Sequence, residues 1–171
     1  MTMRAPKIRI RMHHISLIQD LDRVSSAHRG ELIHLALSFL DHFSGIEDIE
    51  RAVLQAFSLQ GRDTGRWEID GDFVSPLFRA LSLSEVRPWF EKGVMNLREV
   101  EVVDAKGELH RIDRVVISEE VLEVIDFKVG RQEEDHPAQV ALYKELVKNM
   151  FRRPVLGYLL YIDEPSLVAV P

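Results

Sequence analysis

Cysteine is missing from this sequence of 171 residues. Disulfide bonds, zinc sites built on thiolates and cysteine-ligated iron–sulfur clusters are therefore excluded. Long hydrophobic runs are missing as well, because no apolar stretch approaches the roughly 20 residues that span a bilayer. The N-terminus also lacks the apolar core of a secretory signal peptide. We therefore expect a cytoplasmic protein with no membrane partner.

Basic residues are outnumbered by acidic ones. Lys and Arg number 22 against 28 Asp and Glu, and the net charge of −6 does not by itself indicate nucleic-acid binding. The basic residues are unevenly distributed, because the first nineteen residues contain Arg4, Lys7, Arg9 and Arg11 and no acid. We predict a basic arm or linker over residues 1–24, followed by a single domain over 25–171. The arm suits a phosphate substrate, and it equally suits a linker cut from a larger protein.

Three strands rich in Val and Ile are predicted in the middle of the chain, over 99–103, 108–117 and 121–129. If Gly107 takes the left-handed position of a three-residue hairpin loop, Glu99 lies opposite Asp113. An even-length turn at Glu119-Glu120 then places Asp113 opposite Asp126. Lys128, two residues further along, points to the same face.

Three carboxylates side by side would repel one another at a separation of about 5 Å. A divalent cation removes that repulsion, because hard ions such as Mg²⁺ bind carboxylate oxygens. The alternative is that one turn is misread, since a slip of one residue would send one acid to solvent. The spacing alone favours neither reading.

The flanking segments predict helices over 25–43, 46–60 and 73–91, the last in two pieces with Ser84 as a candidate cap. A fourth helix is expected from Pro137 to about Met150, with buried strands over 155–162 and 166–170 and an edge strand or extended arm over 7–12. This order indicates an α/β (α+β) fold with one mixed sheet. His34 lies in the first helix, where a histidine is more often a core or boundary residue than a ligand. The pair His13-His14 is an even weaker candidate for metal binding.

Two motifs carry a resemblance to a known family: Ile112-Asp113-Arg114-Val115, and Val124-Ile125-Asp126-Phe127-Lys128-Val129-Gly130. Here the chain resembles the PD-(D/E)XK nuclease superfamily, most of all the RecB/AddA-type nuclease domain at the C-terminus of UvrD-like helicases. Four further features follow in the order found in that family, and together they cover about residues 25 to 165. They are the helix Arg29-Gly30-Glu31-Leu32-Ile33-His34, the strand at Arg98-Glu99-Val100, the helix motif Gln139-Val140-Ala141-Leu142-Tyr143, and the final core strand from Gly157.

The resemblance implies a restriction-endonuclease-like core, in which helices flank a mixed sheet with an antiparallel meander. It also implies that His34, Asp113, Asp126 and the carbonyl of Phe127 hold one or two Mg²⁺ or Mn²⁺ ions. Lys128 would position or activate the attacking water. Further roles are implied for the metal-orienting Glu99 and for two residues that would contact the nucleic-acid backbone, Gln139 and Tyr143.

The leading hypothesis is therefore a metal-dependent deoxyribonuclease in recombination or repair, with DNA as its partner. A helicase would lie upstream in the same polypeptide or act as a separate partner, since no Walker-type phosphate loop occurs in this chain. The alternative is a non-catalytic DNA-binding or structural module of a helicase complex with the same fold. An unrelated ligand-binding α/β domain is the third possibility. The loop at 129–135 departs from expectation, because it is rich in acids for a segment beside DNA.

Overall fold

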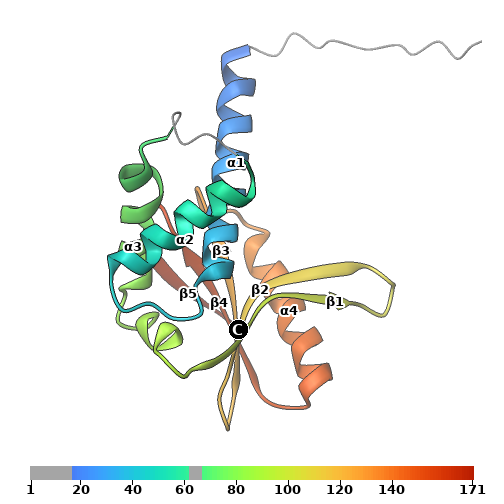
Figure 1. The fold of residues 1–171 in the computed structure, drawn as a ribbon. Helices are drawn as coiled ribbons and strands as arrows, with labels where there is room; N and C mark the ends of the chain where they lie inside the picture. Colours follow the sequence, from blue (N-terminus) through green and yellow to red (C-terminus); the bar gives the residue numbers. More distant parts are fainter. Residues whose placement is uncertain (1–16, 62–66) are drawn as a thin grey trace, which may run out of the picture.

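A five-stranded sheet organises the computed structural model, which describes residues 17–61 and 67–171, with side chains from residue 25 onward. The strands follow one another in chain order, and every pair is antiparallel except β3 and β4 (Figure 1). The strands are β1 (Met95–Val103), β2 (Leu109–Ile117), β3 (Leu122–Lys128), β4 (Val155–Tyr161) and β5 (Ser166–Val170). The predicted α/β (α+β) class with one mixed sheet is confirmed. The predicted strand at 7–12 and the pair His13-His14 lie outside the described residues.

The predicted register of the two hairpins is confirmed. The Asp104 N–H donates to the Glu108 carbonyl at 2.9 Å, and the Ser118 N–H donates to the Val121 carbonyl at 3.1 Å. On β1 and β2, the pairs Arg98–Arg114 and Val100–Ile112 bracket Glu99 and Asp113. The β2–β3 ladder ends at the pair Arg114–Ile125, one residue before Asp113 and Asp126 would meet. The acids therefore lie where the backbone pairing of these two strands stops.

Helix α1 (Leu17–Phe39) corrects the predicted range of 25–43 at both ends. It begins earlier because residues 17–24 contain neither Gly nor Pro, and the serines at 25 and 26 are tolerated within a helix. It ends earlier because the backbone groups of residues 40–43 form hydrogen bonds with other parts of the chain. Arg114 donates to the Leu40 and Asp41 carbonyls, and the Phe43 N–H donates to the Phe90 carbonyl. Helix α2 (Ile46–Leu59) agrees with its prediction and is followed by Gly61 at φ 60°.

The segment predicted as two helical pieces over 73–91 is less regular than expected. A π-helical turn (Asp70–Val74) leads into α3 (Ser75–Leu81), and the second piece is only a 3₁₀ turn (Arg87–Phe90). Pro76 has no N–H to give the Asp72 carbonyl, which accepts a hydrogen bond from Arg29 Nε instead, at 2.8 Å. The predicted cap at Ser84 is wrong, because its hydroxyl donates to the neighbouring Glu85 carboxylate.

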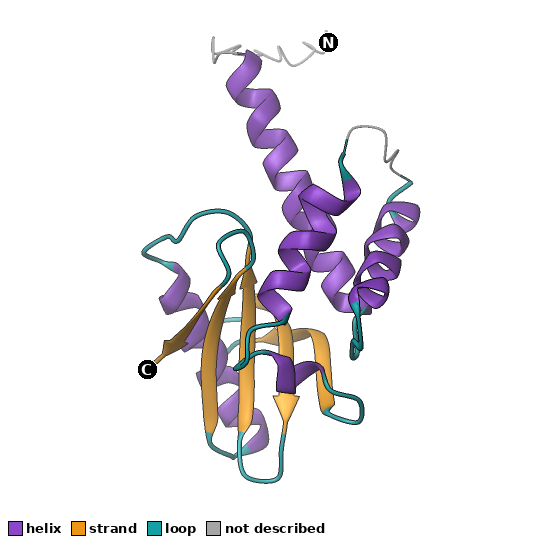
Figure 2. Cartoon of the chain, turned by 90° about the vertical axis from the view of Figure 1, so that its left-hand side faces the viewer, coloured by secondary structure: helices purple, strands orange, loops and turns teal. Residues whose placement is uncertain are grey.

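Two helical layers cover the sheet (Figure 2). The helices α1, α2 and α3 pack on the face that carries Ile125 and Phe127. Helix α4 (His136–Phe151) connects β3 to β4 and packs on the opposite face against Val115 and Val124. Asp113 lies two residues before Val115, and Asp126 lies two residues after Val124. Side chains two residues apart on a strand share a face, so both acids are on the face that α4 covers.

Candidate functional site

An open cleft of about 940 Å³ lies among α1, the β1–β2 hairpin, the end of β3 and the start of α4. Of the eight site residues that the sequence predicts, all but Asp126 line it. These seven are His34, Glu99, Asp113, Phe127, Lys128, Gln139 and Tyr143. The cleft therefore collects side chains from four separate segments of the chain.

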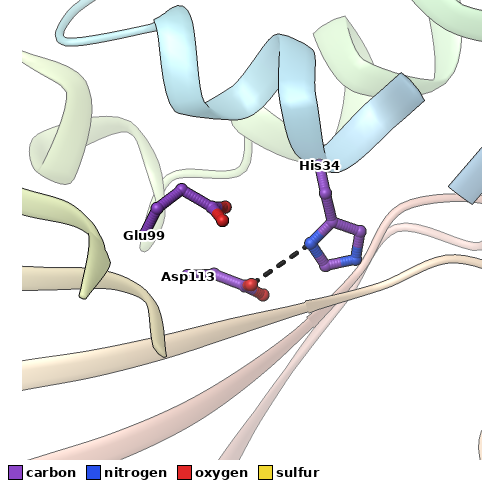
Figure 3. Close-up of side chains that lie close together, drawn as sticks. All are labelled: His34, Glu99 and Asp113. Atoms are coloured by element: carbon purple, nitrogen blue, oxygen red, sulfur yellow. Dashed lines mark hydrogen bonds and ion pairs between the residues drawn. The ribbon is translucent and has the colours of Figure 1, made fainter. Parts of the chain in front are cut away.

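Three potential metal ligands converge in this cleft (Figure 3). One atom each from His34, Glu99 and Asp113 lies within 4.8 Å of the others. His34 Nδ1 and Asp113 Oδ1 are 3.2 Å apart, a hydrogen-bonded contact between α1 and β2. An imidazole and two carboxylates are ligands that suit a divalent cation.

Asp113 also joins β2 to β3. It is 7% exposed, and its second oxygen, Oδ2, accepts a hydrogen bond from the Phe127 N–H at 2.8 Å. The side chain thus occupies the place where the next ladder bond would form, beyond the pair Arg114–Ile125. As a result, one oxygen is fixed against β3 while the other faces His34.

Asp126 lies deeper than the other acids, at 3% exposure, and does not join the three-ligand cluster. Its Oδ2 is 2.8 Å from Lys128 Nζ, yet among the described residues this oxygen has no hydrogen bond of good geometry. Burial and the negative charge of Asp113 raise the pKa of Asp126, although Lys128 and His34 oppose that rise. A buried carboxylate oxygen with incomplete partners is a suitable place for a cation to bind.

Lys128 begins a chain of polar contacts that runs onto α4. Its ammonium donates to Gln139 Oε1 at 2.7 Å, and Gln139 Nε2 donates to the Tyr143 hydroxyl at the same distance. The spacing of four residues places Gln139 and Tyr143 on one face of the helix. Burial raises the pKa of Tyr143, so its hydroxyl keeps its proton near neutral pH.

Glu99 has an unusual backbone. Its φ of 51° lies in the left-handed region, which a non-glycine residue inside a strand seldom adopts, although the β1–β2 register is the same on both sides of it. Its carboxylate is 2.9 Å from Arg111 Nε. Burial and the charge of Asp113 raise the pKa of Glu99, while Arg111 and His34 lower it. Arg111 is a site residue that the sequence analysis missed. The clue was its position two residues before Asp113, which puts both side chains on one face.

Opposing effects act on the pKa of His34. Burial alone lowers the pKa of the imidazole, but the hydrogen bond to Asp113 and the charges of Asp113, Asp126 and Glu99 together raise it. Without a metal, these acids therefore favour the protonated form of the imidazole. A metal would bind the neutral ring and replace that positive charge.

Two other groups in the described residues bring acids close to a histidine. Asp104 and Glu108 lie in the β1–β2 turn and His110 at the start of β2, and Asp104 Oδ1 already accepts two backbone N–H groups. Glu133, Asp135 and His136 lie at the start of α4, and their acids are exposed. Neither group is shared between separate elements of the fold, as the His34 cluster is. No helix in the described part of the chain is long and apolar enough to cross a membrane.

Comparisons with known proteins give a family rather than a close relative. No curated protein sequence matches the chain. A solved structure, described as the crystal structure of SSO0001, is similar at 17% sequence identity and a TM-score of 0.35, over 83% of this chain. The chain spans 65% of the length of that structure. The sequence model of the PD-(D/E)XK nuclease superfamily matches residues 8–168, nearly the whole length. Since the match includes the strands and helices that bring His34, Glu99, Asp113 and Lys128 together, the chain belongs to the PD-(D/E)XK nuclease superfamily.

Proposed function

We propose that this protein is a divalent-metal-dependent nuclease that hydrolyses phosphodiester bonds of DNA. The observation that carries the proposal is the convergence of His34, Glu99 and Asp113 in an open cleft, with Lys128 lining the same cleft. Members of the superfamily are generally nucleases that use divalent metals. Neutralisation of developing charge and activation of water are what phosphodiester hydrolysis requires, and a bound cation supplies both.

The residues present fit such an ion. His34, Asp113 and Asp126, with the carbonyl of Phe127, would hold Mg²⁺ or Mn²⁺, and Glu99 would bind or orient it. The donor set is mainly oxygen, as hard cations prefer. The incompletely bonded Oδ2 of Asp126 supports this assignment, because a cation would complete its coordination.

Lys128 would act on the water and the phosphate. Its ammonium is already held by Asp126 and Gln139, so its position is fixed before substrate binds. A lysine acts as a compact positive charge and can also exchange protons. Gln139 and Tyr143 would hold Lys128 in place and contact the nucleic-acid backbone.

The resemblance to RecB/AddA-type domains supports a proposal for the cellular setting. We propose a cytoplasmic role in recombination or repair, together with a helicase that lies in the same polypeptide or in a partner. Residues 1–24 would then lead into the nuclease domain, with 17–24 forming the first part of α1. The alternative, a non-catalytic DNA-binding or structural module, differs in one measurable property, since it would bind DNA without cutting it.

Cleavage of end-labelled DNA tests the proposal directly. We expect the wild type to cut in Mg²⁺ or Mn²⁺ and to stop in EDTA. Asp113→Asn removes the charge of a metal ligand and should lower turnover. Lys128→Met should lower turnover by about 10²- to 10³-fold, the usual effect of losing one charge-stabilising group. Glu101→Gln is the matched control, because this exposed acid lies two residues from Glu99 on β1. Equal cleavage in EDTA would overturn the metal mechanism, and binding without cleavage in every metal would favour the non-catalytic module.

A further inference from the structure

A second concave surface lies at the C-terminal end of α4. Its volume is about 1060 Å³, and four cations line it: Lys144, Lys148, Arg152 and Arg153. Glu145 is the only acidic side chain in the lining, so four cationic side chains stand against one anionic side chain. That concentration is notable in a chain with a net charge of −6. We call this surface the basic groove.

These cations are not neutralised by neighbouring acids. Among the side chains that the structure describes, no carboxylate lies within 4.0 Å of any of the four. Some exposed cations elsewhere in the fold do have such partners, as Arg51 has Asp48 and Arg111 has Glu99. The positive charge of the basic groove is therefore available to an external anion.

Two of the cations are held in position by the fold. Lys144 Nζ donates to the Val170 carbonyl at 2.9 Å, and its stem lies over Gly157, where a Cβ atom would come within 2.5 Å of Lys144 Cδ. Arg153 donates to the Ser118 carbonyl. An ammonium has three donor hydrogens and a guanidinium has five, so each side chain keeps further donors for a ligand.

Arg152 occupies a backbone position that favours a different residue. Its φ is 52° and its N–H donates to the Lys148 carbonyl at 2.8 Å, the left-handed cap usually taken by Gly or Asn. The helix dipole makes a cation at this end favourable. The helix dipole does not explain why the cation is at Arg152, the position in this turn whose left-handed backbone a side chain strains.

We infer that the basic groove binds the phosphate backbone of the same nucleic acid whose scissile bond would lie in the cleft. This inference rests on the proposed function. Helix α4 joins the two surfaces, because Gln139 and Tyr143 line the cleft while Lys144, Lys148 and Arg152 line the basic groove. Its 16 residues extend about 24 Å, the rise of about seven nucleotides along one strand of a duplex. Backbone phosphates match a row of unpaired cations without requiring any base contact.

The test variant is the double substitution Lys148→Gln with Arg152→Gly. Neither change should endanger the fold, because Gln is a good helix former and Gly suits the left-handed cap. The control, Arg79→Gln with Lys92→Gln, removes the same charge from exposed positions outside both surfaces. Fluorescence anisotropy in EDTA would measure Kd for labelled single strands of about 24 and about 6 nucleotides over a range of salt concentrations. The longer strand covers both surfaces, whereas the shorter one, bound in the cleft, has too few phosphates to cover the basic groove as well.

For the longer strand, we expect the groove variant to raise Kd about tenfold at low salt and to reduce the salt slope by about 1.4, since each lost phosphate contact contributes about 0.7. The control should stay within about twofold of the wild type, and so should both variants on the shorter strand. Equal Kd values for the groove variant and the control on the longer strand would overturn the inference.

Cleavage of the shorter strand in Mg²⁺ separates this inference from the proposed function. If all three proteins cut it equally and only the groove variant loses affinity for the longer strand, both proposals are supported. If the wild type cuts nothing while the groove variant still loses that affinity, the basic groove is supported and the nuclease proposal fails. If all three cut both strands and bind them equally, the nuclease proposal stands and the basic groove is overturned.

Discussion

At the scale of single residues, the charged carboxylate of Asp126 is destabilised by its surroundings in the folded protein. Burial and the charge of Asp113 raise its pKa above the ordinary value, and Lys128 offsets only part of that effect. A raised pKa in the folded state means that the folded protein holds the proton more tightly than the unfolded chain does. The stability that this group contributes is fully present below its unfolded pKa and is lost as pH rises through its folded pKa.

Asp126→Asn should therefore stabilise the metal-free protein near neutral pH. The gain in the free energy of unfolding should shrink as pH falls toward about 4, where the wild-type carboxyl of the unfolded chain also becomes protonated. Urea denaturation in EDTA over a pH series measures this difference. Glu101→Gln, the exposed control, should change stability little at any pH. A destabilised Asp126→Asn protein at neutral pH would show that the ion pair with Lys128 outweighs burial.

At the scale of elements, a single arginine ties three segments together. Arg29 on α1 forms two hydrogen bonds with the Asp163 carboxylate, at 2.7 and 3.1 Å, and a third with the Asp72 carbonyl. Asp163 also accepts the Gly130 N–H at 2.8 Å, just beyond the end of β3. The helix that carries His34 is thus fastened to the segment that follows Lys128.

Arg29→Gln should lower the free energy of unfolding by about 1–3 kcal/mol, because it removes a partly buried, charge-assisted pair and leaves the Asp72 carbonyl without its donor. A loss of 1 kcal/mol corresponds to about 2–4 °C in Tm for a chain of this size. Arg51→Gln is the matched control. It breaks an ion pair with Asp48 in which the arginine is 73% exposed, and such pairs contribute about 1 kcal/mol or less. Equal losses in the two variants would mean that Arg29 does not fasten α1.

The elements that follow from local chemistry were predictable from the sequence. Turn residues such as Gly107, at φ 83°, set the hairpin registers, and Pro137 marked the start of α4. Two of the errors arose where distant groups override local preference. Arg114, 74 residues from Leu40, takes the carbonyls at the end of α1. Arg29, 43 residues from Asp72, takes the carbonyl that Pro76 leaves unpaired. Neither contact has a signal in the neighbouring residues.

At the scale of the whole molecule, the sequence predicted which residues gather at the candidate site but not how they are arranged within it. Strand register brings Glu99 next to Asp113, yet Asp126 lies behind them with Lys128 rather than inside the cluster. That separation depends on the end of the β2–β3 ladder, where Asp113 bonds to the Phe127 backbone. Hydrophobic alternation cannot reveal it, because alternation fixes the face of a side chain and not where the pairing of two strands stops.

A cation in this site would act on the stability of the entire fold, because its ligands come from α1, β1, β2 and β3. A ligand that binds only the folded state stabilises it by about 2.7 kcal/mol at a concentration of 100 times its Kd. We therefore expect Mn²⁺ to raise the Tm of the wild type by about 5–10 °C over its value in EDTA. Glu101→Gln should show the same rise, whereas Asp113→Asn should lose most of it, since Asp113 alone contacts both α1 and β3 from the centre of the cluster. Calorimetric scans with and without Mn²⁺ measure these shifts. An equal rise in Asp113→Asn would place the cation elsewhere on the protein.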